Sequence, residues 1–402
     1  MPQDSPSVAA RAAAPGLRRS DFLAFSPPAI GEAEIAAVVA TLRSGWITTG
    51  PKVREFEQRF ADWVGAPAAL ALNSCTAGLH ASLVALGIKE GDEVITTPMT
   101  FAATVNVIEH VGATPVLVDI EADTMNIDVD QVAAAITPNT KVILPVHYAG
   151  HPVQLDALRA LAEEAGATLL EDAAHAVAAK YRGKLIGSGT NPTCFSFYAT
   201  KNLTTCEGGM LTGEPDFIDK VRVIGLHGMS RDAWRRYEQG ANWFYGVTMP
   251  GYKYNMTDMQ AAMGLVQLDR LNRMQLRRTE IAHDYSAAFE EIEALQTPTE
   301  RMDVEHAWHL YVLRLNLDLL SINRAQFIEE MTARNIGTSV HFIPIYRHPY
   351  YVEKYKFDFS AFPVCEESFS RMVSLPIHPR LSDYDVRTVI SAVVDVVDEF
   401  SA

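Results

Sequence analysis

The segment Cys194–Met210, CFSFYATKNLTTCEGGM, determines how the rest of the chain is interpreted. It begins with an apolar run, Cys194 to Tyr198, of the kind that forms a buried strand. The run then breaks into polar residues around a single lysine, Lys201, and closes on Glu207 and two glycines. Desolvating a lysine there is costly unless its amine is paired or used covalently. Because burial favours the neutral amine, which attacks carbonyl groups, Lys201 is the first candidate for a catalytic residue.

Strand-like and helical segments alternate upstream of this segment. The strand-like runs are Ala68–Leu72, Asp92–Pro98, Thr114–Ile120, Lys141–Gly150 and Ala167–Ala176. This alternation indicates βαβ crossovers and a largely parallel sheet, in which ligands bind beyond the carboxyl ends of the strands. Residues with polar or aromatic side chains lie at or just past these ends: Ser74, Thr76, Thr100, Phe101, His147, Asp172, His175 and Lys201. The sequence therefore predicts one site along this edge.

The order of segments predicts two domains and a tail. Residues 1–24 are rich in Ala, Ser, Pro and Arg and lack the apolar core of a secretory signal, so we expect a disordered tail. Residues 25–280 form the predicted large α/β/α domain, and residues 281–402 the smaller α+β domain. The long helical stretch Arg270–Glu293 bridges them. In the small domain, His306–Leu317 and Gly337–Phe342 are strand-like.

Composition narrows the classes of function. The chain has 402 residues and a formal net charge of -15, which opposes nucleic acid or an anionic membrane as the main partner. It contains no apolar run near the roughly 20 residues that span a bilayer. The four cysteines have neither disulfide-framework nor zinc-site spacing, so we expect reduced thiols, no metal and a cytoplasmic protein.

The residues at the predicted site fit the needs of pyridoxal phosphate (PLP). This cofactor needs a lysine for its aldehyde and a carboxylate that keeps its ring nitrogen protonated. Lys201 and Asp172 are the candidates. Phe101 could stack on the ring, the Cys75–Thr76 turn with Ser196 could hold the phosphate, and His175 could approach the phenolic oxygen. Four of these residues also have a structural explanation, as a helix cap for Asp172 or Thr76 and as core packing for Phe101 or His175.

The motifs carry a resemblance to a known family. The chain resembles the DegT/DnrJ/EryC1/StrS family of sugar aminotransferases, which have the fold type I (aspartate aminotransferase-like) architecture of PLP-dependent transferases. The resemblance runs in family order from about Ser26 to the C-terminus. Its matching stretches include SGWITTGP, NSCTAGLHASL, GDEVITTPMTFAATVN, PVHYAG, EDAAHA, FSFYATKNLTTCEGGM, GYKYNMTDMQAA, HAWHLY and SLPIHP.

The resemblance implies a role for each cofactor residue. Lys201 would be the Schiff-base lysine, which later moves the proton, and Asp172 the partner of the ring nitrogen. Asn255 would reach the cofactor phosphate of the neighbouring subunit, which makes the active unit a homodimer with shared sites. The other implied contacts are with the ring for Phe101 and His175, and with the phosphate for Thr76, Ser196 and the backbone N–H of Cys75.

The resemblance also implies a substrate class. PVHYAG, GYKYN and HGMSRDAW are most similar to members that act on C4 of UDP-linked 4-keto sugars, such as the enzyme making UDP-4-amino-4-deoxy-L-arabinose. The expected reaction converts a UDP- or dTDP-linked 4-keto sugar to the amino sugar, with L-glutamate as donor, 2-oxoglutarate as product and the PMP form in between. The expected substrate contacts are Trp46, Thr48, His147, Tyr148, Lys253 and His341.

Three other functions are weighed. The enzyme could aminate a C3-keto sugar nucleotide or a cyclitol ketone, or the protein could be a non-catalytic sensor of PLP or nucleotide sugar. The retained Lys201 and Asp172 oppose a sensor. A metal hydrolase using His306 and His309 is disfavoured, because alternation along a strand would place the two histidines on opposite faces.

Overall fold

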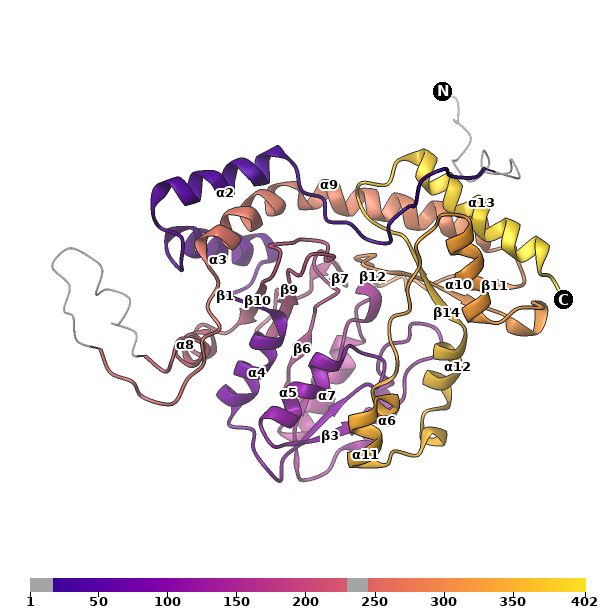
Figure 1. Ribbon diagram of the computed structural model, residues 1–402. Helices are drawn as coiled ribbons and strands as arrows, with labels where there is room; N and C mark the ends of the chain where they lie inside the picture. The colour runs from indigo at the N-terminus through magenta and orange to yellow at the C-terminus, as the bar shows by residue number, and fades with distance from the viewer. Residues whose placement is uncertain (1–16, 230–244) are drawn as a thin grey trace.

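The computed structural model describes residues 17–229 and 245–402. A large sheet lies in the middle of the molecule, and helix α9 (Asp258–Phe289) runs along one side of it into the small C-terminal domain (Figure 1). Residues 1–16 of the predicted tail lie outside the described residues. In the part of the chain that the structure describes, no helix is long and apolar enough to cross a membrane.

The main sheet is mostly parallel, as predicted. Its strands follow the order β3-β2-β4-β5 and β6-β9-β10-β1, and the two halves continue into each other because Leu170 N donates to Ile143 O and Val146 pairs with Asp172. Among the described strands of this sheet, β10 runs opposite to all the others. The strands are β1 (Ala68–Leu72), β2 (Glu93–Thr96), β3 (Thr114–Leu117), β4 (Thr140–Ile143), β5 (Thr168–Leu169), β6 (Glu171–Asp172), β9 (Thr193–Ser196) and β10 (Gly209–Gly213).

Apolar side chains on both faces of these strands explain the two helical layers. Val94 and Leu211 belong to one buried cluster, whereas their chain neighbours Ile95 and Met210 belong to another, as expected when side chains alternate along a strand. Helices α4 (Cys75–Leu86), α5 (Ala102–His110) and α8 (Pro215–Ile224) cover the first face. Helices α3 (Pro51–Val64), α6 (Val129–Ala135), α7 (Leu155–Ala165) and the first half of α9 cover the second.

The small domain has its own core around an antiparallel sheet. Helix α9 contributes to both cores, because Met274 packs in the large one and Ile281 in the small one. The elements are β11 (Leu295–Gln296), β13 (Tyr311–Leu315), β14 (Met372–Leu375), α10 (Arg324–Ala333), α11 (Pro349–Tyr355), α12 (Pro363–Arg371) and α13 (Asp383–Glu399). A second small sheet joins β12 (Val304–Glu305), β7 (Lys180–Tyr181) and β8 (Lys184–Leu185).

Residues 17–24 are ordered against the small domain, which corrects the predicted boundary of the tail. Leu23 is buried and pairs with Ile336, with Leu23 N donating to Asn335 O at 2.8 Å and Gly337 N donating to Leu23 O at 2.9 Å. Arg19 forms an ion pair with Asp385 at the start of α13. Backbone pairing with a distant segment cannot be recognised from the local composition, so the prediction of disorder was wrong here.

Two predicted strands in the small domain are shorter than expected. The run His306–Leu317 is regular only from Tyr311, because Trp308 has a left-handed backbone (φ 47°) that interrupts the alternation. The run Gly337–Phe342 contributes a single bridge, Ser339 to Ser374, instead of a strand. Both irregular segments place histidines beside Lys201, as described below.

Helix α2 (Glu32–Ser44) turns its apolar face outward. Its buried residues are Glu34 and Thr41, and Glu34 accepts a hydrogen bond from Gln267 Nε2 at 2.7 Å besides pairing with Arg270. The side chains expected at helical spacing lie on the other side, with Ile35 48% and Leu42 50% exposed. An exposed apolar helix face suggests a partner surface.

Candidate active site

Lys201 lies in a tight turn that follows β9. Lys201 N donates to Tyr198 O at 3.0 Å, and Phe197 N closes the loop by donating to Gly208 O at 2.8 Å. The amine lies 3.4 Å from His309 Nε2. Burial lowers the pKa of Lys201 to about 8, although the charges of Asp172 and Cys75 oppose this change. A substantial fraction of the amine is therefore neutral near pH 8, as a nucleophilic lysine requires.

Asp172 ends β6 and lies buried close to the lysine. Its Oδ2 accepts a hydrogen bond from Thr104 Oγ1 at 2.8 Å, and its Oδ1 accepts one from Ala174 N at 3.1 Å. Burial raises the pKa of Asp172, whereas these two hydrogen bonds and the charge of Lys201 lower it. The side chain is held firmly, and an ionised carboxylate here would suit a protonated ring nitrogen.

The candidate phosphate cradle lies where β9, β10 and the start of α4 meet. Gly209 lies opposite Ser196 in the sheet, and a Cβ atom on Gly209 would lie 2.5 Å from Cys75 N, so only glycine permits this close approach. Ser74 caps α4 by accepting from Ala77 N at 3.0 Å. Cys75 and Thr76 occupy the first turn, where N–H groups have no acceptor within the helix and bind phosphate well.

Neutral imidazoles lie near the amine, and aromatic rings pack against these imidazoles. Phe101 precedes α5, is 63% exposed, and lies 5.9 Å from Phe342 between ring centroids. His175 accepts from Ala149 N at 3.2 Å through Nδ1, and His341 Nδ1 lies 2.9 Å from Ser374 Oγ. Burial and then Lys201 lower the pKa of both histidines, to about 4 for His341. Both rings are therefore neutral near pH 7 and add no positive charge beside the lysine.

The structure does not bring His147 and Tyr148 to an open site, in contrast to the prediction. His147 is fully buried, with Nε2 3.1 Å from Glu171 Oε2 and Nδ1 accepting from Val153 N. Tyr148 is buried in an apolar cluster and donates its hydroxyl to His341 O. Both residues follow a strand end, but their side chains point into the protein. They can therefore contact residues of the site, as Tyr148 contacts His341, but they do not face an open pocket.

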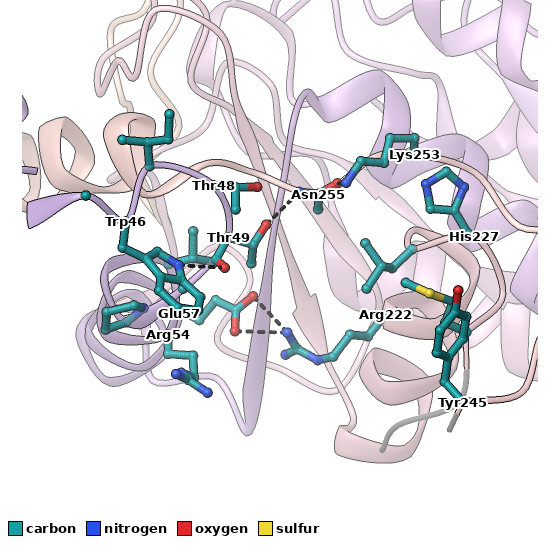
Figure 2. Close-up of a pocket in the computed structure, with 17 residues that line it drawn as sticks. Trp46, Thr48, Thr49, Arg54, Glu57, Arg222, His227, Tyr245, Lys253 and Asn255 are labelled. Atoms are coloured by element: carbon teal, nitrogen blue, oxygen red, sulfur yellow. Dashed lines mark hydrogen bonds and ion pairs between the residues drawn. The ribbon is translucent and has the colours of Figure 1, made fainter. Parts of the chain in front are cut away.

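Three of the other predicted substrate residues line a separate cavity of about 1130 Å³ (Figure 2), whereas His341 is not among the described residues that line it. Trp46, Thr48, Lys253 and Asn255 lie on its wall, whereas Lys201 and Asp172 are not among the described residues that line it. Asn255 Nδ2 donates to Thr49 Oγ1 at 2.6 Å, and Trp46 Nε1 donates to Thr49 O at 3.1 Å. Within one chain, the predicted site residues therefore form two groups, one near Lys201 and one on the wall of this cavity.

Charged side chains lie on several parts of the wall of this cavity (Figure 2). Arg222 points at Glu57 and pairs with it at 3.0 Å, while Arg54 and Lys253 supply further positive charge (Figure 2). Asn73, at the end of β1, donates to Lys253 O at 3.4 Å, so the cavity adjoins the loop that leads to the phosphate cradle. The aromatic residues Trp234, Tyr237, Trp243 and Phe244 lie outside the described residues.

Three polar residues at the centre are not among the cofactor or substrate residues that the sequence predicts. His309 touches the lysine amine, Asn202 binds His309, and Thr104 binds Asp172. Asn202 directly follows the lysine and Thr104 lies one turn into a helix beyond Phe101, so both positions could have been considered. His309 lies in the run His306–Leu317, for which the sequence predicts a regular strand, but the left-handed backbone of Trp308 interrupts that strand. Among the described residues, no group of three or more His, Cys, Asp or Glu could hold a metal ion.

Comparison with known proteins identifies the family. The model of the DegT/DnrJ/EryC1/StrS aminotransferase family matches residues 28–394. An uncharacterized protein of Methanocaldococcus jannaschii is 52% identical over 95% of this chain and 99% of its own length. The spore coat polysaccharide biosynthesis protein SpsC of Bacillus subtilis is 51% identical over 94% of this chain and 98% of its own length.

Solved structures agree with the predicted fold type and cofactor. The PLP form of Spr1654 from Streptococcus pneumoniae, named as a sugar aminotransferase, has a TM-score of 0.87 at 36% identity and covers 94% of this chain and 99% of its own. Its PMP form has a TM-score of 0.88 at 38% identity, with the same coverage. The cradle at Gly209, the buried Asp172 and the Lys201 amine fit PLP. The chain therefore belongs to the DegT/DnrJ/EryC1/StrS aminotransferase family, and it is a PLP-dependent aminotransferase of fold type I.

Proposed function

We propose that this enzyme transfers the amino group of L-glutamate to the C4 carbonyl of a UDP- or dTDP-linked 4-keto sugar. The products would be 2-oxoglutarate and the 4-amino sugar nucleotide. The observation that carries the proposal is the large cavity described above, which combines Arg54 and Lys253 with the aromatic ring of Trp46. Cations suit a diphosphate, and an aromatic face suits a base or sugar ring.

The chain's own residues have defined tasks in this reaction. PLP, when bound, supplies an electron sink for the carbanion formed at the amino-bearing carbon. Lys201 Nζ, with its lowered pKa, takes the proton from that carbon and later returns one. Asp172 would hold the protonated ring nitrogen, and the first turn of α4 with Ser196 would hold the phosphate. His175 and Phe101 would limit how the ring can lie.

Named relatives support a sugar as the amino acceptor. SpsC is named as a protein of spore coat polysaccharide biosynthesis. PseC of Helicobacter pylori, an aminotransferase involved in the biosynthesis of pseudoaminic acid, has a TM-score of 0.87 at 27% identity. These names describe those proteins, and they favour an amino sugar destined for a glycan as the product here.

We also propose that the active unit is a homodimer. Asn255, Trp46 and Lys253 line a cavity that does not include Lys201, so these residues can serve the site of a second subunit. The outward apolar face of α2, with Ile35 and Leu42, offers a surface for such a subunit.

A cytoplasmic location suits the four cysteines, which are all free thiols.

A substrate panel tests the choice of sugar. Purified enzyme with glutamate would be offered UDP- and dTDP-linked 4-keto sugars, 3-keto sugar nucleotides and cyclitol ketones, with 2-oxoglutarate release measured. Turnover confined to the 3-keto sugars or the cyclitols would remove the C4 assignment.

A spectroscopic titration separates an enzyme from a sensor. The protein incubated with PLP should absorb in the visible range, and addition of glutamate should bleach that band as the amino form accumulates. A Lys201→Ala variant serves as the control and should not cycle. A wild-type protein that binds the nucleotide sugar but never consumes glutamate would support the sensor alternative.

A further inference from the structure

The hydrogen bonds of Asn202 fix the tautomer of His309. Asn202 Nδ2 lies 2.7 Å from Ala307 O and 3.3 Å from Gln275 Oε1, and both of these atoms can only accept. The amide must therefore point its nitrogen toward them and its Oδ1 toward His309. Asn202 Oδ1 lies 3.2 Å from His309 Nδ1, so this ring nitrogen carries the hydrogen and donates it.

The other nitrogen of His309 is then a bare acceptor aimed at the lysine. In a neutral imidazole with Nδ1 protonated, Nε2 has a lone pair and no hydrogen. This atom lies 3.4 Å from Lys201 Nζ, whose N–H groups can donate to it. The imidazole stays neutral because the ring is buried and because Lys201, His175, Arg278 and His341 all oppose a positive charge on it.

Helix α9 holds the segment that carries His309. Gln275 Nε2 donates to His306 O at 3.1 Å, and one turn later Arg278 Nη1 donates to Trp308 O at 3.1 Å. Arg278 Nη1 also donates to Ile377 O at 2.9 Å, on the far side of the segment. Residues three apart lie on the same face of a helix, so both can hold one short segment. Such bracing from a rigid element gives His309 a defined position.

We propose that His309 is a further residue of the catalytic centre, and that Asn202 is a positioning residue acting through it. His309 Nε2 accepts an N–H of Lys201 and sets the direction of the amine whenever the amine is released from the cofactor. Asn202 keeps the imidazole in the tautomer that can accept. The inference rests on the PLP-dependent activity of the family and is independent of which sugar is used.

Two substitutions at His309 separate its two nitrogens. His309→Gln places an amide near the position of Nε2, so it can still accept from Lys201. His309→Asn places its amide near the position of Nδ1, so it keeps the contact with Asn202 and loses the one with Lys201. We expect the Asn variant to lose about 10²-fold in kcat, as misplaced reacting groups do, and the Gln variant to recover part of this loss.

An isosteric substitution at Asn202 tests the tautomer. Asn202→Asp keeps an acceptor for Nδ1–H but adds a negative charge, which favours the imidazolium. An imidazolium has no acceptor at Nε2 and repels the lysine, so kcat of this variant should gain an acid limb and fall as pH decreases from 8 to 6. The wild type should show no such limb from His309.

The same variants are measured as apoproteins, without cofactor or substrate. The rate at which trinitrobenzenesulfonate modifies Lys201 would be followed from pH 6 to 10, with the site located by peptide mass mapping. We expect the modification rate of Lys201 in His309→Gln to vary with pH much as it does in the wild type, and the rate in His309→Asn to differ more. The proposal would be overturned if the modification rates of His309→Gln and His309→Asn had the same pH dependence. It would also be overturned if the pH dependence for Asn202→Asp were identical to that of the wild type. Because this readout needs no sugar, its failure is distinct from failure of the proposed function.

Discussion

Lys201 is a buried amine whose protonation is linked to folding. Its pKa is about 8 in the folded protein and about 10.4 in an unfolded chain. Between these values the unfolded state binds more protons, so the stability of the apoprotein gains a contribution that rises with pH. Below pH 8 this lysine is at its most destabilising, and the cost disappears as pH rises past about 10.

We therefore expect Lys201→Met to be more stable than the wild type at pH 7 and to lose that advantage by about pH 10. Urea unfolding of both apoproteins at intervals of pH gives the difference directly. Lys184→Met, on the exposed strand β8, is the control and should show a difference that does not vary with pH. Parallel curves for wild type and Lys201→Met would show that the amine is not desolvated.

We expect Asp172 to contribute its negative charge to the site more than its shape. Asparagine at this position can still accept hydrogen bonds from Thr104 and Ala174 through its oxygen, so the fold should survive Asp172→Asn. The variant loses the charge that would hold a protonated ring nitrogen, and we expect kcat to fall by about 10²–10⁴-fold. The pH midpoint of Lys201 modification should also fall, because Asp172 raises the pKa of Lys201. A rate near that of the wild type would exclude the assigned role.

Among the elements, the junction of β10 with α4 depends on one missing side chain. A Cβ atom at Gly209 would lie 2.5 Å from Cys75 N, so Gly209→Ala must push the start of α4 away from the sheet. We expect a loss of about 1–3 kcal/mol in the free energy of unfolding and a weaker hold on the cofactor phosphate. Denaturant titration and a PLP binding isotherm measure the two effects.

Gly189→Ala is the matched control for this junction. Gly189 has no heavy atom within 4 Å of a Cβ position, apart from its immediate neighbours, so the same added methyl group should be tolerated. If both variants bind PLP with equal affinity, the close approach at Gly209 does not serve the phosphate.

The main sheet could be predicted because its strands carry local signals. Short apolar runs such as Val94–Ile95 have side chains buried on both faces, and small polar turns end them. The same logic located Lys201 and Asp172 at strand ends. It could not place His147, because the backbone conformation after a strand decides whether a side chain points outward or inward. The position of His309 could not be predicted either, because the left-handed backbone of Trp308 interrupts the expected strand.

Helix α2 shows a second limit of pattern reading. The periodicity of Ile35 and Leu42 identified a helix but not the direction in which its apolar face points. In the structure Glu34 takes the inner position, because Gln267 and Arg270 of α9 provide its partners. A buried acidic residue paired across two helices is a tertiary feature that no window of local sequence contains.

At the scale of the whole molecule, this outward face supports the proposed homodimer. Ile35→Asp together with Leu42→Asp would place charges in the proposed contact, and we expect dissociation to monomers with loss of activity. Sedimentation velocity at several concentrations measures the assembly. Met302→Asp, on an exposed turn before β12, is the control and should leave the assembly unchanged. A doubly substituted protein that remains dimeric would place the interface elsewhere.

Helix α9 has a consequence for how the molecule melts. Its 32 residues form one rod of about 48 Å, and the large and small cores each bury part of it. Neither core can unfold without exposing apolar side chains of α9. Because α9 belongs to both cores, this exposure destabilises the packing of the other core. We therefore expect the apoprotein to give one calorimetric endotherm with matching van't Hoff and calorimetric enthalpies. Two resolved endotherms would show that the rod breaks between Met274 and Ile281 before either core is lost.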